Sequence, residues 1–341
     1  MLSIENLEKE LKNGKLQSLY LLYGEELFLL ESSLKKIKTL FGNCTKGINY
    51  ITMDETNCSE LIADIETPSF GYDKKLIVAR NTGLLKKEGK RKNVELAKWK
   101  EKVSNYLKEN IQVIQASVVL VFVEEEADTK QELYKTIDEL GIVCKFDYQK
   151  PMQIEKRMKA ICQGYKVAIE DGTLRYFIES CGTNMQDLIN EIRKLIEYAG
   201  EEGKIQKEDI DKLCIKKLES VIFDLTDSLG KRDITKALEV FKNLIYAKEP
   251  IQRILITLYN HFKKLYFVKL AVKCNKDIIT SLNLKPNQTF LVNKYKTQAQ
   301  YFKEMELRDI LQNLRDLDFN YKNGLVDLQI GLETILCRFC S

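Results

Sequence analysis

The run Val118-Val119-Leu120-Val121-Phe122-Val123 is apolar at every position. A strand with one wet face alternates apolar and polar residues, so a run without alternation indicates a strand buried on both faces of a parallel sheet. Apolar residues at helical spacing separate it from other short apolar runs, so residues 1–150 are predicted to form a parallel α/β domain. The other runs are Leu19–Tyr23, Ile48–Ile51, Leu76–Ala79 and Ile142–Phe146.

The rest of the chain is predicted to be helical. Pro151 ends the α/β region, and Leu188–Ile196 carries apolar residues at helical spacing before Gly200 stops the pattern. Residues 151–210 are therefore predicted to form a small helical domain. Residues 211–341 are helical in pattern throughout and are predicted to form a helical bundle. The predicted fold class is α/β plus all-α, in three domains.

Composition places the chain among ordinary soluble proteins. Its 341 residues are 44% hydrophobic and 30% charged, and only four are proline, which favours helices over a β-sandwich. No apolar run reaches the roughly 18 residues of a membrane span, and the N-terminus lacks a basic stretch followed by an apolar core. We therefore expect a cytoplasmic protein with neither a signal peptide nor a membrane partner.

Nine cysteines raise the question of a disulfide scaffold or a metal site. Only Cys337 and Cys340 have Cys-x-x-Cys spacing, and no second pair or nearby histidine completes four ligands. An odd number of cysteines without a secretory signal indicates reduced thiols. We expect core or surface thiols and no metal site.

Charge is unevenly distributed along the chain. The net charge is +4, yet residues 211–341 hold 22 Lys and Arg against 15 Asp and Glu, a balance of +7. A basic C-terminal third is a weak indication of nucleic acid nearby, and solvated helix faces are the simpler interpretation. The charged segment 86–108 has the same two interpretations, and it lacks the interleaved aromatics typical of a nucleic-acid patch.

The turn after the first strand, Tyr23-Gly24-Glu25-Glu26, occupies the position of a phosphate loop. Such a loop needs several glycines, whose amides converge on phosphate, and a lysine for charge. Here one glycine and two carboxylates stand in their place. Glu125-Glu126-Ala127-Asp128 follows the central strand, where metal-binding acids of nucleotide hydrolases often lie, but without a phosphate loop it carries little weight. We expect no nucleotide and no other cofactor.

Nucleophilic catalysis would have to recruit the sole histidine, His261. It lies within an apolar helical stretch, where a partly buried or capping histidine is the default, and no Gly-x-Ser-x-Gly elbow occurs. We therefore predict no catalytic residues and a protein that is not an enzyme.

The segment Thr67-Pro68-Ser69-Phe70-Gly71-Tyr72 places two aromatics beside Pro and Gly in a short connection. Exposed aromatics on a rigid turn are the usual anchors of a protein interface. The alternative is a turn that tucks Phe70 under the sheet. The residues alone leave both open.

Five segments in this order resemble the delta subunit family of the bacterial DNA polymerase III clamp loader, over essentially the whole chain. Each is weakly specific alone, whereas the order and spacing of all five make a strong match. They are Leu19–Glu26, Thr67–Val78, Asn184–Leu195, Ile222–Leu229, and Asp318 with Lys322–Gly324.

This resemblance implies an AAA+-like first domain without a working nucleotide site, a helical lid domain and a helical collar domain. The collar of that family joins the ATPase subunits and the delta-prime subunit, and the complex acts on primed DNA. The first domain binds the sliding clamp and opens its ring. The loop that corresponds to Thr67–Tyr72 inserts apolar side chains into the clamp, which implies Phe70 here. Members often carry two large apolar residues side by side, whereas this chain has Ser69 before Phe70, so Pro68 or Tyr72 would supply the missing contact.

Two other hypotheses remain open. An active nucleotide hydrolase would show ATPase activity in the purified chain. A free-standing DNA-binding module would bind DNA without partners and in a salt-dependent manner. A degenerate AAA+ adaptor of another replication complex is a further alternative.

Overall fold

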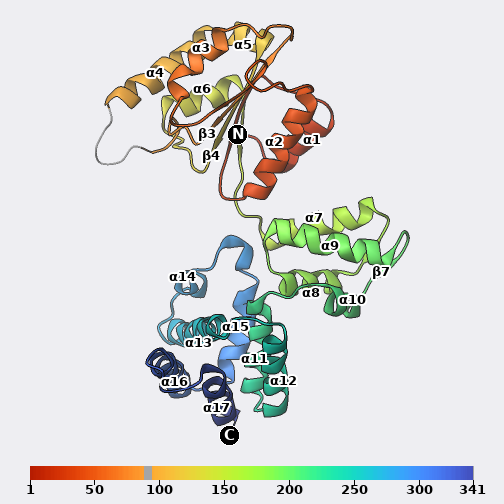
Figure 1. Ribbon diagram of the computed structural model, residues 1–341, viewed down its shortest axis with the longest axis vertical. Coiled ribbons are helices and arrows are strands. Elements are labelled where there is room, and N and C mark those ends of the chain that lie inside the picture. Colours follow the sequence, from red (N-terminus) through yellow and green to blue (C-terminus); the bar gives the residue numbers. More distant parts are fainter. Residues whose placement is uncertain (88–93, 341) are drawn as a thin grey trace. The chain divides into compact units, whose positions relative to one another are not determined.

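The computed structural model describes residues 1–87 and 94–340, and the side chains of Val94 and Cys340 lie outside this description as well. The charged segment predicted over 86–108 and the Cys337–Cys340 pair therefore fall partly outside the described residues. The chain forms two compact units, Met1–Tyr148 and Gln149–Ser341 (Figure 1).

The first unit contains a five-stranded parallel sheet in the order β2-β3-β4-β1-β5. The strand predicted from the apolar run is confirmed, because β4 lies between β3 and β1 and is buried at all seven positions. Ile48 is not in a strand, since β2 begins two residues later and Ile48 is exposed in the preceding loop. The strands are β1 (Leu19–Tyr23), β2 (Tyr50–Met53), β3 (Lys75–Arg80), β4 (Val118–Glu124) and β5 (Ile142–Lys145).

Helices cover both faces of this sheet, as expected when strands are apolar throughout. Figure 1 shows α1 and α2 on one face and α3 to α6 on the other. Leu61 of α3, Leu107 of α4 and Ile137 of α6 share one core with Ile77 and Leu120 of the sheet. The helices are α1 (Ile4–Lys12), α2 (Leu27–Phe41), η1 (Cys58–Glu60), α3 (Leu61–Glu66), α4 (Val94–Glu109), α5 (Ile111–Ser117) and α6 (Glu132–Leu140).

The second unit begins with four helices and a short strand pair. Ala168 and Ile169 pair in parallel with Lys204 and Ile205 as β6 (Ala168–Ile169) and β7 (Lys204–Ile205). The sequence predicts a small helical domain over 151–210, and it does not indicate this strand pair, because two-residue strands leave no periodicity in the sequence. The helices are α7 (Pro151–Gly164), α8 (Asp171–Cys181), α9 (Met185–Ala199) and α10 (Lys207–Leu213).

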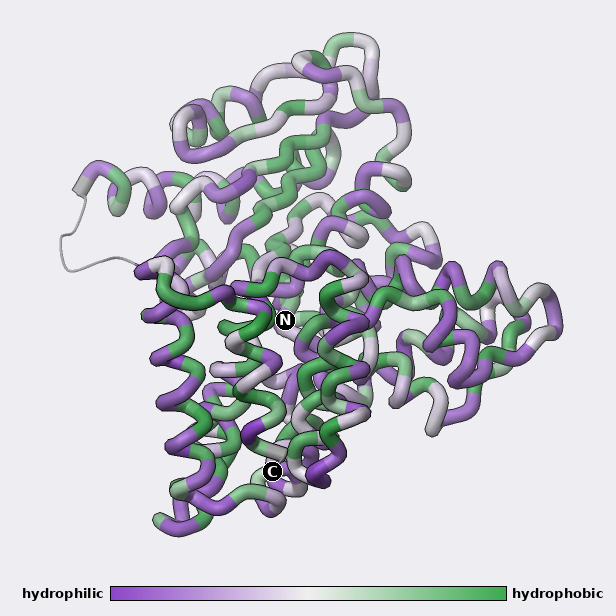
Figure 2. The backbone as a smooth tube through the Cα atoms, turned by 60° about the horizontal axis from the view of Figure 1, so that its bottom comes forward, coloured by the Kyte–Doolittle hydropathy of each residue, from purple (hydrophilic) through white to green (hydrophobic). Residues whose placement is uncertain are grey.

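The remaining helices form the predicted bundle around one core that runs from Leu218 to Phe339. Figure 2 shows hydrophobic and hydrophilic residues alternating along these helices, as expected for elements with one buried face. They are α11 (Leu218–Gly230), α12 (Ile234–Tyr246), α13 (Ile251–Lys273), α14 (Ile278–Leu282), η2 (Pro286–Gln288), α15 (Leu291–Gln300), α16 (Glu304–Lys322) and α17 (Leu328–Cys340).

The α/β plus all-α fold class is confirmed, and the three-domain division stays a prediction. Among the described residues, no helix combines the length and the apolar character needed to cross a membrane.

Candidate functional site

The carboxyl edge of the sheet, where an α/β protein of this kind would bind a nucleotide, is closed by its own backbone. The amide of Gly24 donates to the carbonyl of Glu124 at 3.2 Å, and the amide of Glu26 donates to the carbonyl of Phe146 at 2.9 Å. The amide of Phe146 in turn donates to the carbonyl of Tyr23 at 2.7 Å. These amides of the turn are therefore aimed at carbonyls and not at a phosphate.

Gly24 serves the packing of the chain at this edge. Its φ is +133°, and a Cβ added there would lie 2.3 Å from the carbonyl oxygen of Phe146. A side chain would displace the segment after β5. The glycine of this turn is thus required by a close backbone approach inside the fold.

Glu124, the last residue of β4, is buried and hydrogen-bonded to the loop that follows β3. Its carboxylate accepts the Thr82 amide at 3.0 Å and the Thr82 hydroxyl at 2.7 Å. Burial raises the pKa of the Glu124 carboxyl above its ordinary value, although the hydrogen bonds from Thr82 act in the opposite direction. In the acidic segment beyond it, Glu126 forms an ion pair with Lys86 at 3.8 Å. Glu124 therefore joins β4 to the loop after β3, whereas the exposed pair of Glu126 and Lys86 contributes little.

The opposite, amino edge of the sheet carries the loop Thr67–Tyr72. Strands β2 and β3 run parallel, so the segments that precede them lie at the same edge. Thr67 ends α3, because both its amide and its hydroxyl donate to the carbonyl of Ala63, at 2.9 and 2.7 Å. The loop therefore starts from a fixed point.

Lys75, the first residue of β3, fixes the loop from below. Its side chain is 2% exposed, and its Nζ donates to the carbonyls of Asp64 at 2.8 Å and Thr67 at 2.6 Å. A cation at a helix C-terminus also interacts favourably with the helix dipole. Burial lowers the pKa of Lys75, and nearby Asp64 partly offsets this. Lys75 is not among the predicted site residues, although a lysine that opens an otherwise apolar strand is the signal for it.

The tip of the loop is a tight turn from Ser69 to Tyr72. The Tyr72 amide donates to the Ser69 carbonyl at 3.1 Å, and the Ser69 hydroxyl donates to the Tyr72 carbonyl at 2.8 Å. Gly71 has φ +80°, a conformation that favours glycine in this position of a turn. Phe70 is 78% exposed, so the alternative in which it tucks under the sheet is wrong.

A second loop supports the tip. The hydroxyls of Tyr72 and Thr45 share a hydrogen bond of 2.7 Å. The buried Asn49 holds that second loop, since its side chain accepts the Thr45 amide at 2.6 Å and donates to the Asn43 carbonyl at 2.7 Å. Thr67, Pro68, Ser69, Phe70, Gly71 and Tyr72 thus form one braced surface loop. Its role in binding stays a prediction.

His261 is buried within α13, more completely than the partly buried or capping position that the sequence predicts. Its Nε2 lies 2.7 Å from Oε1 of Gln298, whose amide group donates to the Phe223 carbonyl at 2.9 Å. Burial lowers the pKa of His261 to about 3, so the imidazole is neutral near pH 7. It belongs to a buried hydrogen-bonded network of the core.

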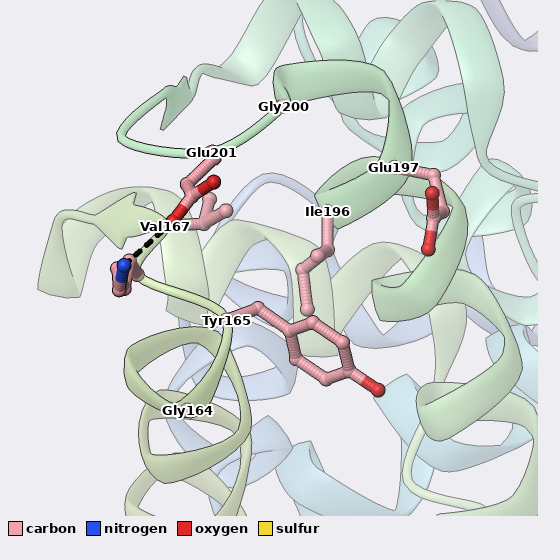
Figure 3. Close-up of a pocket in the computed structure, with 8 residues that line it drawn as sticks. Gly164, Tyr165, Val167, Ile196, Glu197, Gly200 and Glu201 are labelled. Atoms are coloured by element: carbon pink, nitrogen blue, oxygen red, sulfur yellow. Dashed lines mark hydrogen bonds and ion pairs between the residues drawn. The ribbon is translucent and has the colours of Figure 1, made fainter.

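A hollow of about 300 Å³ lies where α7 and α9 end in the second unit (Figure 3). Tyr165, Val167 and Ile196 line it. The charged groups at its rim, Lys166 and Glu201, form an exposed ion pair of 2.6 Å with each other. Because this pair is already matched on the surface, we assign no ligand to the hollow.

Comparisons with known proteins agree with this structure. The family model of the DNA polymerase III delta subunit matches residues 20–147, and the model of the delta subunit's C-terminal domain matches residues 219–339. DNA polymerase III subunit delta of Bacillus subtilis is 26% identical over 338 residues, which cover 97% of this chain and 95% of that protein. The probable DNA polymerase III subunit delta of Aquifex aeolicus is 26% identical over 312 residues, covering 89% and 85%.

A solved structure shares the fold. The Bacillus subtilis DNA clamp loader delta protein superposes with a TM-score of 0.74 at 23% identity, and the match covers 99% of each chain. The resemblance seen in the sequence is confirmed. Two family models in the expected order, together with relatives aligned over nearly the whole chain, show that the chain belongs to the DNA polymerase III delta subunit family.

Proposed function

We propose that the chain is the clamp-opening subunit of a replicative clamp loader and that Thr67–Tyr72 is its clamp-binding loop. Phe70 inserts into an apolar pocket of the sliding clamp, and Pro68 and Tyr72 contribute the contact area that Ser69 does not provide. The observation that carries the proposal is an exposed phenylalanine at the tip of a loop held from three sides.

Bracing matters because association costs conformational freedom. A loop that is already ordered loses less entropy on binding than a flexible one. Lys75 fixes the start of the loop, the turn closed by Gly71 fixes the tip, and the Tyr72–Thr45 hydrogen bond fixes the end. Burying Phe70 then contributes roughly 1.5–3 kcal/mol.

One phenylalanine cannot open a stable ring by itself. A ligand shifts an equilibrium only by its difference in affinity for the two states. The neighbouring helix α3 (Leu61–Glu66) would therefore bind the open clamp better than the closed one, with Phe70 as the anchor.

In this proposal, the partner subunits hydrolyse ATP, and the chain joins them through its collar. Amides of the closed carboxyl edge donate to carbonyls of the fold, which supports a subunit without its own ATPase activity. The AAA+-like domain 1–150 and the lid 151–210 are followed by the collar 211–341, which joins the ATPase subunits and delta-prime. The protein works in the cytoplasm.

A second role, contact with primed DNA, is favoured by one segment of the collar. Residues 251–303 contain ten Lys and Arg and a single acidic residue, Asp277. That carboxylate accepts the Thr280 amide at 2.8 Å and caps α14. Three of the ten cations form ion pairs with acids outside this segment, and the positive charge of the others suits a phosphate backbone.

The proposal is tested by mixing the purified full-length chain with the sliding clamp of the same organism, without ATP. We expect a complex in gel filtration, together with faster ring opening in a clamp labelled across one interface. Absence of a complex at micromolar concentrations, or ATP hydrolysis by the chain alone, would contradict it. DNA binding that is equally tight without any partner would favour the free-standing nucleic-acid module.

A further inference from the structure

Three helices of the second unit bring two cysteines and a glutamate together. Cys181 is the last residue of α8, Glu191 lies within α9, and Cys214 directly follows α10. One ligand atom of each residue lies within 4.8 Å of the others. Cys181 is buried, and Cys214 is partly accessible from solvent.

The carboxylate of Glu191 is held in place by two donors on the same oxygen. Its Oε2 accepts the amide of Ile215 at 3.0 Å and lies 2.7 Å from Nζ of Lys194. Lys194 also donates to the carbonyl of Leu213 at 3.3 Å. These contacts orient the group in the way that outer hydrogen bonds orient metal ligands.

We propose that Cys181, Glu191 and Cys214 bind one zinc ion, with a water molecule as the fourth ligand. Thiolate and carboxylate ligands in a tetrahedral arrangement suit zinc and similar soft divalent metals. Nothing in the established family membership assigns this site.

The charges of this site balance. Two thiolates and one carboxylate carry three negative charges, and the zinc ion with the ammonium of Lys194 carries three positive ones. Each neutral thiol loses a proton to solvent when its S–Zn bond forms, so binding one ion releases two protons. No oxidation or reduction takes place.

The ion would join three helices at the start of the bundle. Cys181 lies beside Ser180, whose carbonyl accepts the amide of Lys217 at 2.9 Å, immediately before α11 begins. The segment from Cys214 to Lys217 connects α10 to α11. A zinc ion would fix this connection and raise the stability of the fold.

The test uses the full-length chain, reduced and freed of metal, with Cys337→Ser and Cys340→Ser as background. These two changes remove the one Cys-x-x-Cys pair in the sequence, which could also bind metal. Zinc is titrated against a chromophoric chelator, and Co²⁺ serves as the spectroscopic probe. We expect one ion and two released protons per chain, sulfur-to-cobalt charge-transfer absorption, and a higher unfolding temperature with zinc.

Three variants locate the site. Cys181→Ser and Cys214→Ser should each remove stoichiometric binding, and Glu191→Gln should weaken it about tenfold or more. Cys162→Ser, a change at another buried cysteine of the same unit, is the matched control and should bind zinc normally. Should Cys181→Ser fail to fold, the partly exposed Cys214 and the Glu191→Gln change still decide the question.

Three results would overturn the proposal. The first is cobalt binding without thiolate absorption, and the second is zinc binding that is unchanged in Cys214→Ser and Glu191→Gln. The third is a metal-free chain in which Cys181 and Cys214 form a disulfide with each other and which, once reduced, binds no zinc.

Discussion

The two edges of one five-stranded sheet have opposite characters in this protein. At the carboxyl edge, Gly24 and Glu26 give their amides to neighbouring carbonyls, and the buried Glu124 is bound by Thr82. At the amino edge, the hydrogen bonds hold a loop from within and leave Phe70 at its tip exposed. One parallel sheet can thus close its carboxyl edge with its own backbone and present a braced, exposed loop at its amino edge.

Gly24→Ala should produce the largest effect, on stability. The backbone strain of a non-glycine residue costs about 1–3 kcal/mol, and the overlap with Phe146 adds about 1–3 kcal/mol. We expect the free energy of unfolding to fall by about 3 kcal/mol or more in urea titrations. Gly42→Ala is the control, because Gly42 also has positive φ, at +95°, with nothing within 4 Å of an added Cβ. Equal losses in both variants would show that the carboxyl edge is not tightly closed.

Lys75→Met should lower stability by about 1–3 kcal/mol, because the carbonyls of Asp64 and Thr67 lose their buried donor. It should also weaken clamp binding, since the loop loses its anchor. Lys74→Met, a change at the neighbouring and more accessible lysine, should cost about 0.5 kcal/mol or less. If Lys75→Met left clamp affinity unchanged in folded protein, bracing of the loop would be irrelevant to binding.

Glu124→Gln should change the pH dependence of stability. The pKa of Glu124 is raised in the folded state, so the native chain binds more protons than the unfolded chain between the two pKa values. The contribution of Glu124 to the stability of the unmodified chain should therefore fall as pH rises through this window, with a slope of at most about 1.4 kcal/mol per pH unit. The amide that replaces the carboxyl does not titrate, so the stability difference should shift in favour of the variant as pH rises. Differences that stay constant from acid to neutral pH, measured by urea unfolding, would contradict a buried carboxylate at this edge.

Tyr72→Phe should have the smallest effect. It removes the partly exposed hydrogen bond to Thr45, worth about 0.5–1 kcal/mol. Chemical denaturation measures the loss, and Tyr246→Phe, on a highly exposed ring of the bundle, is the control. A stability equal to that of the control would mean that the second loop does not support the first.

The sequence predicted those features that depend on local pattern. The uninterrupted apolar run Val118–Val123 located the central strand. The turn at Gly24 predicted only that a phosphate would not bind there, and not the backbone hydrogen bonds that close the carboxyl edge. The exposure of Phe70 could not be decided from sequence, because it depends on how the loop meets its neighbours. Lys75 was missed because a charged residue at the start of a strand is usually solvated. Cys181 and Cys214 meet only through the packing of α8, α9 and α10, which their spacing in the chain does not reveal.

The most direct test of the account is a titration of the sliding clamp with two matched variants. Phe70→Ala and Phe319→Ala each truncate a largely exposed phenylalanine, in the first and second unit respectively. Both should fold normally, since exposed positions contribute little to stability. We predict that Phe70→Ala weakens clamp binding about tenfold or more, a loss of ~2 kcal/mol, while Phe319→Ala binds like the unmodified chain. Unchanged clamp affinity in folded Phe70→Ala would contradict the account.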